Sequence, residues 1–397
     1  MQGGICLDIF AKCYEKNLAD EIREKDLYPY FRALESRQDR EVIMEGKRRI
    51  MLGSNNYLGL TTNPEIIEAG VHALEQYGTG CSGSRFLNGT LTMHLELEAE
   101  LARFLHKDGV VTFSTGFQSN LGIISAIVGK GDYVICDREN HASIYDGCKL
   151  SYGKMVRYRH SDMGHLEKLL QQVPENAGAL IVTDGVFSMG GDIANLPEIC
   201  RLAKQYSARV MVDDAHGLGV IGEGGRGTAS HFGLEDEVDI YMGTFSKSLA
   251  SLGGYMAASA RICDYVRHAS RPHIFSASIP PANCAVALAS LRYIEKHPEL
   301  VQHLSDLAAY GRKVYKEKGI PIMESTTPII PIYTYEAMRT LAIQKEIYEN
   351  GVYVNAVLPP ACAPSECLLR TSFMATLTEP LIDEAAEIMA KVIHAHE

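Results

Sequence analysis

The middle of the chain alternates between short apolar runs and longer amphipathic segments. The runs are GVVTFS, YVICD, KMVRYRH, ALIVTDG, ARVMVDDA, VDIYMGT and GGYMAAS, all between residues 109 and 259. Most of them are apolar and β-branched along their length, which is typical of strands buried on both faces. Helical patterns such as DMGHLEKLLQQV and LPEICRLAKQY separate them. This alternation predicts βαβ units and a mostly parallel sheet covered by helices on both faces.

The pattern changes towards both ends of the chain. At the N-terminal end, a helix and an arm are predicted, and the hairpin-like stretch REVIMEGKRRIMLGS follows. At the C-terminal end, a long helical segment leads to PIIPIYTY and VYVNAV, and the last predicted helix is EPLIDEAAEIMAKVIHAHE. We therefore predict an α/β protein in three parts: an N-terminal helix and arm over 1–50, a large domain over 51–285, and a smaller C-terminal α+β domain over 286–397.

Composition and charge narrow the classes of function. The net charge of −11 disfavours nonspecific nucleic-acid binding, which needs a basic surface. The ten cysteines lie scattered in apolar segments, outside CxxC and zinc spacings, so we interpret them as reduced core thiols. We find neither a signal-peptide pattern nor a long uncharged apolar run. We therefore expect a cytoplasmic protein, with peripheral contact at the inner membrane as an open alternative.

Two motifs resemble nucleotide-binding loops without their context. GEGGRG, residues 222–227, has the GxGxxG spacing, but the dinucleotide fingerprint needs a strand before it and a long helix after it. TASHFGLEDEVD follows instead, so we interpret GEGGRG as a glycine-rich surface loop. SKS, residues 246–248, lacks the glycine that precedes the lysine of a Walker motif. We therefore expect no ATP chemistry.

Several polar residues fall just after the ends of predicted strands, where ligands gather in parallel α/β sheets. Each one alone is more often structural, but their joint order is uncommon. Lys247 stands among small hydroxyl and apolar residues in GTFSKSLASLGG, which is unusual for a solvated lysine. Gly116 and Phe117 begin a predicted helix and are expected to present free backbone N–H groups to an anion. The strand-end residues are His141, Ser188, Asp213, His216, Thr244, Ser246 and Lys247.

One cofactor, pyridoxal 5′-phosphate, accounts for these residue types together. It needs a lysine for covalent attachment, a carboxylate to keep its ring nitrogen protonated, and donors around its phosphate. We predict Lys247 as the lysine and Asp213 as the carboxylate; Asp214 is the rival, because only one of two adjacent strand residues faces a site. His141 is predicted to stack on the ring and His216 to donate to its ring oxygen. The predicted phosphate ligands are Gly116, Phe117, Thr244 and Ser246.

Four segments resemble the α-oxoamine synthases, which are fold-type I pyridoxal-phosphate enzymes. They are GTFSKSLASLGGY, VDDAHGLGVIGEGGRG, NHASIYDG and GTGCSGSRFLNGTLTMHLELE. The resemblance extends from about NNYLGL, residues 55–60, to LLRTSFMATLT, residues 368–378. It implies the fold-type I transferase fold, with a large and a small domain. It also implies an enzyme that condenses an amino acid with an acyl-CoA, releases carbon dioxide and forms an aminoketone.

The resemblance also implies roles for individual residues. Arg370 matches the arginine that holds the amino-acid carboxylate, and Asn56 lies in the segment that approaches the substrate. Ser276, in IFSAS, matches a phosphate ligand from the neighbouring subunit, which implies a homodimer with shared active sites. Catalytic roles are implied for Lys247, His141 and Asp213. The cofactor ligands implied in the same way are Ser188, His216, Thr244 and Ser246.

The choice of substrate rests on weaker similarities. YPYFRALES, GSRFLNGT, RPHIFSASIPP and PPACAP most resemble bacterial members that condense L-serine with palmitoyl-CoA. Two positions depart from the family: Asp214 stands where many members have Glu, and Leu358 stands where some carry an arginine, which leaves Arg370 to act alone. The alternatives are glycine C-acetyltransferase or 8-amino-7-oxononanoate synthase activity, another pyridoxal-phosphate reaction such as that of an aminotransferase or lyase, and a noncatalytic regulatory subunit.

Overall fold

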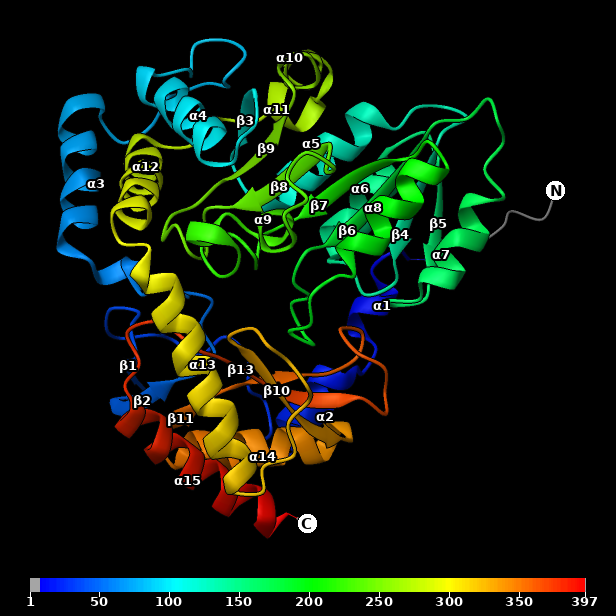
Figure 1. Cartoon of the computed structure of the whole chain (residues 1–397). Helices are drawn as coiled ribbons and strands as arrows, with labels where there is room; N and C mark the ends of the chain where they lie inside the picture. The colour runs from blue at the N-terminus through cyan, green and yellow to red at the C-terminus, as the bar shows by residue number, and fades with distance from the viewer. Residues whose placement is uncertain (1–7, 397) are drawn as a thin grey trace.

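The computed structural model describes residues 8–396, and its centre is a seven-stranded sheet (Figure 1). The strand order is β3-β9-β8-β7-β6-β4-β5. β9 runs antiparallel to both of its neighbours, and the other neighbouring pairs are parallel, which confirms the predicted sheet. The strands are β3 (Gly109–Phe113), β4 (Tyr133–Asp137), β5 (Lys154–Tyr158), β6 (Ala179–Asp184), β7 (Arg209–Asp213), β8 (Ile240–Thr244) and β9 (Gly254–Ala258).

The inner strands are largely apolar because hydrophobic residues pack on both faces of the sheet, whereas the edge strand β5 carries the exposed Lys154 and Arg157. In β7, Val210 and Val212 belong to one hydrophobic cluster and Met211 to another, and all three are buried. Alternate residues of a strand point to opposite faces, so Asp213 follows on the face of Met211, where α5 and α6 pack. The helices around the sheet are α5 (Gly116–Ile127), α6 (Ala142–Leu150), α7 (Met163–Leu170), α8 (Leu196–Gln205), α9 (Thr228–Phe232), α10 (Ala260–Ala269) and α11 (Arg271–Ile274).

The C-terminal part forms a smaller unit around a three-stranded antiparallel sheet of order β10-β13-β12. This confirms the predicted small α+β domain. β13 was not among the predicted strands, because Arg370 interrupts its apolar run. All six of its side chains are nevertheless buried. The elements are α13 (Glu299–Glu317), β10 (Ile329–Tyr335), α14 (Ala337–Glu349), β11 (Val352–Tyr353), β12 (Asn355–Val357), β13 (Cys367–Ser372) and α15 (Glu379–Ala395).

Packing joins segments that the sequence pattern separates. The predicted hairpin forms as β1 and β2, and β2 pairs in parallel with β11 of the C-terminal part. The predicted domain limit at residue 285 lies inside α12, which packs against α3 and α4. The chain then turns at His297 and Pro298 into α13. The elements are β1 (Glu41–Met44), β2 (Lys47–Met51), η1 (Leu60–Thr62), α3 (Pro64–Tyr77), α4 (Thr92–Phe104) and α12 (Pro281–Lys296).

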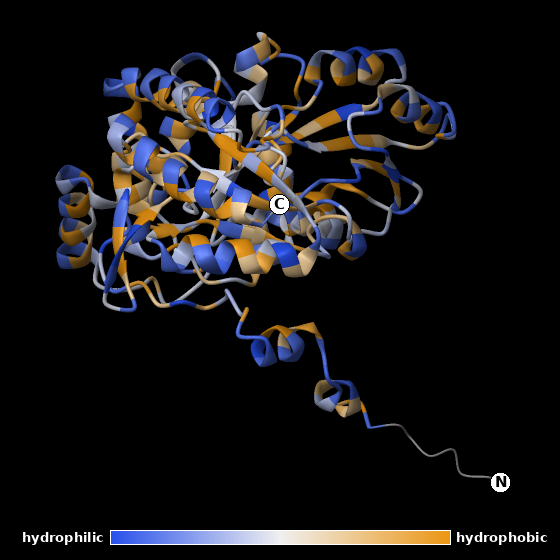
Figure 2. Cartoon of the chain, turned by 90° about the horizontal axis from the view of Figure 1, so that it is seen from below, coloured by the Kyte–Doolittle hydropathy of each residue, from blue (hydrophilic) through white to orange (hydrophobic). Residues whose placement is uncertain are grey.

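The described chain begins with an arm that leaves the body of the molecule (Figure 2). Its first helix, α1 (Ala11–Tyr14), has no buried residue. Its second, α2 (Leu18–Glu24), buries Ile22 in a cluster with Leu341 and Leu358. Within residues 8–396, no helix has the length and apolar character needed to cross a membrane. The cysteines in this range are free thiols.

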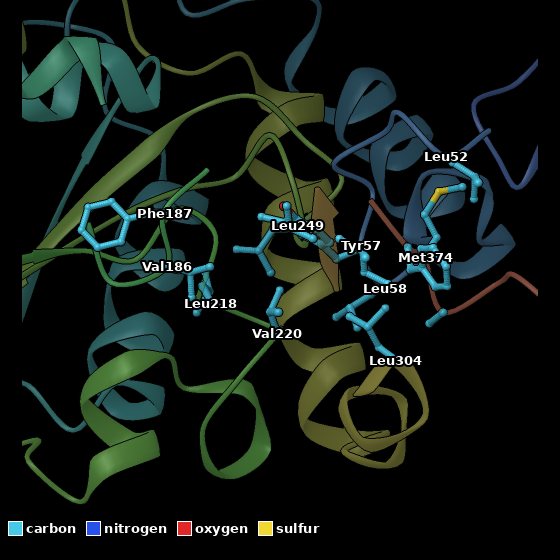
Figure 3. Packing of buried hydrophobic residues seen from close by; sticks show 14 of the residues in the cluster. Leu52, Tyr57, Leu58, Val186, Phe187, Leu218, Val220, Leu249, Leu304 and Met374 are labelled. Atoms are coloured by element: carbon cyan, nitrogen blue, oxygen red, sulfur yellow. The ribbon is translucent and has the colours of Figure 1, made fainter. Parts of the chain in front are cut away.

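A continuous hydrophobic cluster connects the two units beneath the strand ends. Figure 3 shows it extending from Val186 and Phe187 to Tyr57 and Met374. The backbone N–H of Ala375 donates to the carbonyl of Tyr57 at 2.7 Å. The segment after β2 is therefore held beside the segment after β13, and both reach the edge of the sheet where the candidate residues lie.

Candidate active site

Lys247 lies three residues after the end of β8, in a partly buried position. Burial is the main cause that lowers the pKa of its amine to about 8; the charge of Asp213 opposes this shift and the Arg370 guanidinium adds to it. A larger fraction of the amine is therefore neutral near pH 7 than for an ordinary lysine. A neutral, partly buried amine is the form that attacks a carbonyl carbon.

Asp213, the last residue of β7, is only 4% exposed and receives two hydrogen bonds. Asn120 Nδ2 donates to its Oδ2 at 2.7 Å, and the backbone N–H of Ala215 donates to its Oδ1 at 3.0 Å. These donors fix the direction of the carboxylate. Sequence reasoning missed Asn120, although its place one helical turn after Gly116 in STGFQSN puts it on the same side of α5.

The neighbouring carboxylate of Asp214 points elsewhere and is bound by Thr228. The backbone N–H of Thr228 donates to Asp214 Oδ2 at 2.8 Å, and its hydroxyl donates to Oδ1 at 2.5 Å. Burial raises the pKa of Asp214 to about 7, although both hydrogen bonds oppose the shift. Asp213 is thus bound by Asn120 and Asp214 by Thr228, and it is the charge of Asp213 that raises the pKa of Lys247 against the effect of burial.

GEGGRG closes around Asp214 and is only partly a surface loop. Its centre forms the short η2 (Glu223–Gly225), and the five-residue α9 follows, so the long helix of a dinucleotide site is missing here. Gly225 and Gly227 are buried. An added Cβ at Gly227 would lie 2.3 Å from Asp214 Oδ2. The glycine at this position is explained by the approach of that carboxylate.

We expect Gly227→Ala to lower the free energy of unfolding by about 3 kcal/mol or more, because the new Cβ would clash with Asp214 at a φ of +96°. Gly224→Ala is the matched control from the same motif. Its φ is +59° and an added Cβ has open space, so the expected loss is about 1 kcal/mol. Urea unfolding of both variants measures the difference. Equal losses would show that Asp214 does not restrict the loop.

His141 caps the start of α6 and is linked to Asp213 through two side chains. Its Nδ1 accepts from the backbone N–H of Ser143 and lies 2.7 Å from the Ser143 hydroxyl. Asn120 Nδ2 lies 2.8 Å from that hydroxyl and also donates to Asp213. Because Nδ1 accepts, Nε2 holds the proton of the neutral ring. Asp184 accepts from the backbone N–H of His141 at 3.2 Å and fixes its position.

The charge state of His141 follows from its surroundings. Burial lowers its pKa and the charge of Lys247 lowers it further, while Asp213 raises it. Phe117 lies edge-on to the imidazole, with 6.4 Å between ring centroids. Sequence reasoning missed Ser143 and Asp184; Ser143 in NHASIYDG follows a predicted strand, and Asp184 lies at the end of the predicted run ALIVTDG, which was the available signal.

The start of α5 forms a cradle that fits a phosphate. Thr115 caps the helix, and the N–H groups of its first turn have no partner within the helix. An added Cβ at Gly116 would lie 2.8 Å from Thr244 Oγ1, so only glycine allows this approach. The hydroxyls of Thr244 and Ser246 are 2.9 Å apart. Backbone donors, two hydroxyls and the positive end of the helix dipole together suit a phosphoryl group.

Ser276 lies beside the start of α5 in its own chain. Gln118 Nε2, in the first turn of α5, donates to Ser276 Oγ at 3.0 Å. The next residues of its segment are tied to the loop before α4, because the backbone N–H of Ser278 donates to the carbonyl of Gly83 at 2.9 Å. The assignment of Ser276 to the phosphate of a neighbouring subunit stays a prediction.

Arg370 is brought to the site by β13 and is 5% exposed. Its Nη2 donates to Asn55 Oδ1 at 3.0 Å and to the Tyr57 hydroxyl at 3.3 Å, and its Nε donates to the carbonyl of Ser188. Ser188 therefore contacts Arg370 through its backbone. The hydroxyl of Tyr57 lies 2.6 Å from His216 Nδ1. Burial lowers the pKa of His216, and the charges of Lys247 and Arg370 lower it further, so this ring is neutral.

In the NNYLGL segment, the residues that contact Arg370 are not the predicted Asn56 but its two neighbours. Asn56 Nδ2 donates to Thr61 Oγ1 at 2.8 Å, whereas its neighbours Asn55 and Tyr57 contact Arg370. The segment is tightly turned here, since the backbone N–H of Tyr57 donates to the carbonyl of Asn55 at 2.9 Å, and the side-chain amide of Asn56 is directed to Thr61 and not to the arginine. Leu358 is buried in the cluster with Ile22. Its apolar side chain thus has a packing role.

Comparison with known proteins finds similarity over nearly the whole chain. Residues 47–389 match the family described as aminotransferase class I and II. The chain is 50% identical over 381 residues to a serine palmitoyltransferase of Sphingobacterium spiritivorum, covering 96% of each protein. It is 43% identical over 375 residues to an 8-amino-7-oxononanoate synthase of Geobacter sulfurreducens, covering 94% of this chain and 96% of the other.

The fold is also similar to that of solved structures. A lysine-to-alanine variant of serine palmitoyltransferase from S. paucimobilis, with bound pyridoxal phosphate and myriocin, matches with a TM-score of 0.95 and 36% identity. The match covers 98% of this chain and 99% of that chain. The similarity therefore includes both units of the fold and the strand ends where the candidate residues lie.

Proposed function

Since the chain belongs to the family of class I and II aminotransferases, and within it to the α-oxoamine synthases, we propose that it condenses L-serine with palmitoyl-CoA. The products are 3-ketosphinganine, CoA and carbon dioxide. The enzyme is a pyridoxal-phosphate-dependent acyltransferase. Its similarity to several serine palmitoyltransferases supports the choice of serine and of a long acyl chain.

The observation on which the proposal depends is the position of Arg370. It is a buried guanidinium close enough to Lys247 to lower the lysine pKa. Its Nε and Nη2 contact Ser188, Asn55 and Tyr57, and no contact of Nη1 occurs among the hydrogen bonds of the described residues. An amino-acid carboxylate here would offset the charges of both cations. Two parallel hydrogen bonds from one guanidinium would also fix its orientation.

The other residues have complementary roles in this proposal. Bound pyridoxal phosphate supplies an electron sink for the electron pair released at Cα. Lys247 would hold the cofactor and, with its lowered pKa, would remove the Cα proton. Asp213 would keep the ring nitrogen protonated. His141 would cover the ring and present its Nε2–H to the thioester oxygen, and His216 would donate to the ring oxygen.

Two features support a homodimeric, cytoplasmic enzyme. Phe275, next to Ser276, is 79% exposed, and Leu87 of the neighbouring loop is 78% exposed. A second copy over these side chains would remove apolar surface from water and bring Ser276 to a shared site. The free thiols within residues 8–396 support a reducing location.

A competition experiment with product mass spectrometry tests the substrate. The holoenzyme is given L-serine, glycine and L-alanine together, with palmitoyl-, acetyl- and pimeloyl-CoA. We expect 3-ketosphinganine as the main product. A main product from alanine and pimeloyl-CoA would assign the 8-amino-7-oxononanoate synthase reaction instead, and one from glycine and acetyl-CoA the acetyltransferase reaction. Absence of any aminoketone would contradict the condensation itself.

We expect Arg370→Lys to raise the KM for L-serine by about 10–100-fold, because an ammonium cannot make two parallel hydrogen bonds to a carboxylate. The KM for palmitoyl-CoA should stay close to its original value. Steady-state kinetics with each substrate varied in turn measures both constants. Arg261→Lys is the control, since Arg261 is an exposed residue of α10. An unchanged KM for serine would remove Arg370 from the substrate site.

A further inference from the structure

The turn between β6 and α8 is held by residues of the small unit. The carbonyl of Ser188 accepts from Arg370 Nε. The carbonyl of Gly191 accepts from the hydroxyls of Thr327 at 2.8 Å and Ser325 at 3.1 Å. Gly191 has a φ of +70°, and an added Cβ would lie 2.6 Å from the carbonyl of Ile329. One side of this turn is thus packed tightly against the start of β10.

The opposite side of the turn is held by His160, which follows β5. Its Nε2 lies 3.0 Å from Asp192 Oδ2 in the turn, and its Nδ1 lies 3.0 Å from Asp137 Oδ1 at the end of β4. Glu139 Oε2 lies 3.7 Å from Nε2. Both ring nitrogens face carboxylate oxygens, and a histidine can donate from both only as the cation. Burial alone would lower the pKa of His160, but the hydrogen bonds to Asp137 and Asp192 raise it to about 10.

The turn itself is closed by short backbone contacts. The N–H of Phe187 donates to the carbonyl of Asp192 at 2.9 Å, and the N–H of Gly191 donates to the carbonyl of Phe187 at 2.9 Å. The Phe187 ring is buried and meets the imidazole of His160 edge-on, with 4.5 Å between centroids. Figure 3 shows Phe187 beside Val186 at one side of the hydrophobic cluster. A movement of Asp192 would therefore displace Ser188, which directly follows Phe187.

We propose that His160 is a positioning residue for the amino-acid substrate. By its ion pair with Asp192 it holds the 187–192 turn, and the Ser188 carbonyl of that turn orients the guanidinium of Arg370. The inference rests on the proposed function, in which Arg370 binds the substrate carboxylate. His160 itself lies outside that contact and acts only through the turn.

The kinetic test uses the holoenzyme and two variants. His160→Gln removes the double donor and its charge, and Asp192→Asn removes the charge from the other partner. Each variant is expected to raise the KM for L-serine about tenfold, because a small displacement of an orienting group weakens a two-point contact. kcat and the KM for palmitoyl-CoA should change little. His165→Gln is the matched control: His165 lies on α7 and accepts from the backbone N–H of Arg159 at 3.0 Å.

A double substitution shows whether the effect passes through Arg370. In an Arg370→Lys background, His160→Gln should no longer raise the KM for serine, because residues that act on one contact are not additive. A general structural defect would still add its own effect. If His160→Gln does not fold, Asp192→Asn provides the same comparison with the histidine present.

Thermal unfolding of the apoprotein gives a readout that does not depend on activity. The folded-state pKa of His160, about 10, lies above its unfolded value of about 6.5. The ion pair therefore stabilises the fold fully below pH 6.5, and this contribution is lost as the pH rises towards 10. The charged groups facing His160 are Asp137 and Glu139 from the end of β4 and Asp192 from the turn. The Tm difference between the original protein and His160→Gln should shrink over this interval.

The outcomes separate the two proposals. If Arg370→Lys raises the KM for serine and His160→Gln does not, the positioning role is wrong and the proposed function stands. If neither variant changes that KM, the assignment of Arg370 fails, and the inference fails with it. Equal changes in kcat and in both KM values, as for a general loss of structure, would also contradict a positioning role.

Discussion

Lys247→Ala is expected to lower kcat by about 10³-fold or more and to abolish the visible absorbance of covalently held cofactor. The substitution removes the only amine that the site offers for attachment among the described residues, together with the base proposed for the Cα proton. Product formation at saturating L-serine and palmitoyl-CoA, together with an absorbance spectrum of the purified protein, measures the two effects.

The matched control is Lys204→Ala, because Lys204 is an exposed lysine near the end of α8. It should retain both the absorbance and the activity. A Lys247→Ala variant with full activity would contradict the assignment of this lysine. A variant that loses the absorbance but keeps most of its activity would retain Lys247 as the attachment residue and assign the proton transfer to another group.

Asp213→Asn should lower kcat by about 10²–10³-fold, because a neutral amide does not stabilise a positive charge on the ring nitrogen. The amide would also be poorly paired. Asn120 Nδ2 and the Ala215 N–H both donate to the carboxylate, and an asparagine offers only one acceptor oxygen to them. kcat at saturating substrates is the first measurement, and titration of the apoprotein with pyridoxal phosphate is the second.

Asp214→Asn is the control for this prediction, since it makes the same chemical change one residue away. It should retain most of the activity and lose about 1–3 kcal/mol of stability, because one donor of Thr228 would then face an NH₂ group. If Asp214→Asn loses the activity and Asp213→Asn does not, the two carboxylates have been assigned the wrong way round.

Much of the fold was predictable because buried parallel strands have an unusually clear pattern. β4, β6, β7 and β8 are apolar along their length since hydrophobic clusters cover both faces of the sheet. Ligand sites lie at the carboxyl ends of such strands, so Lys247 and the adjacent pair Asp213 and Asp214 could be identified as candidates from their positions, while the choice between the two carboxylates stayed open. The residue types at these strand ends already indicated pyridoxal phosphate, and the resemblance to the α-oxoamine synthases added Arg370, Asn56 and Ser276 to the predicted site.

The sequence by itself could not identify the partners of these residues, because the partners are distant in the chain. Arg370 meets Asn55 and Tyr57 only after β13 packs beside the segment that follows β2. β13 was missed because it contains this arginine, which interrupts the apolar pattern although the strand is buried. The predicted domain limit at residue 285 lies inside α12, because the packing of that helix on α3 is a long-range contact that the local sequence pattern does not show.

The sequence determined which residue types gather at the strand ends, and the tertiary structure decided how each one is used. In the sequence, Asp213 and Asp214 are two adjacent and identical residues. In the fold, α5 packs on one face of β7 and brings Asn120 to Asp213, whereas Thr228 donates to Asp214. His160 likewise becomes a cation only where Asp137 and Asp192 meet it. Hydrophobic patterning is a local property, whereas the direction and charge of a buried polar group depend on what the whole chain places around it.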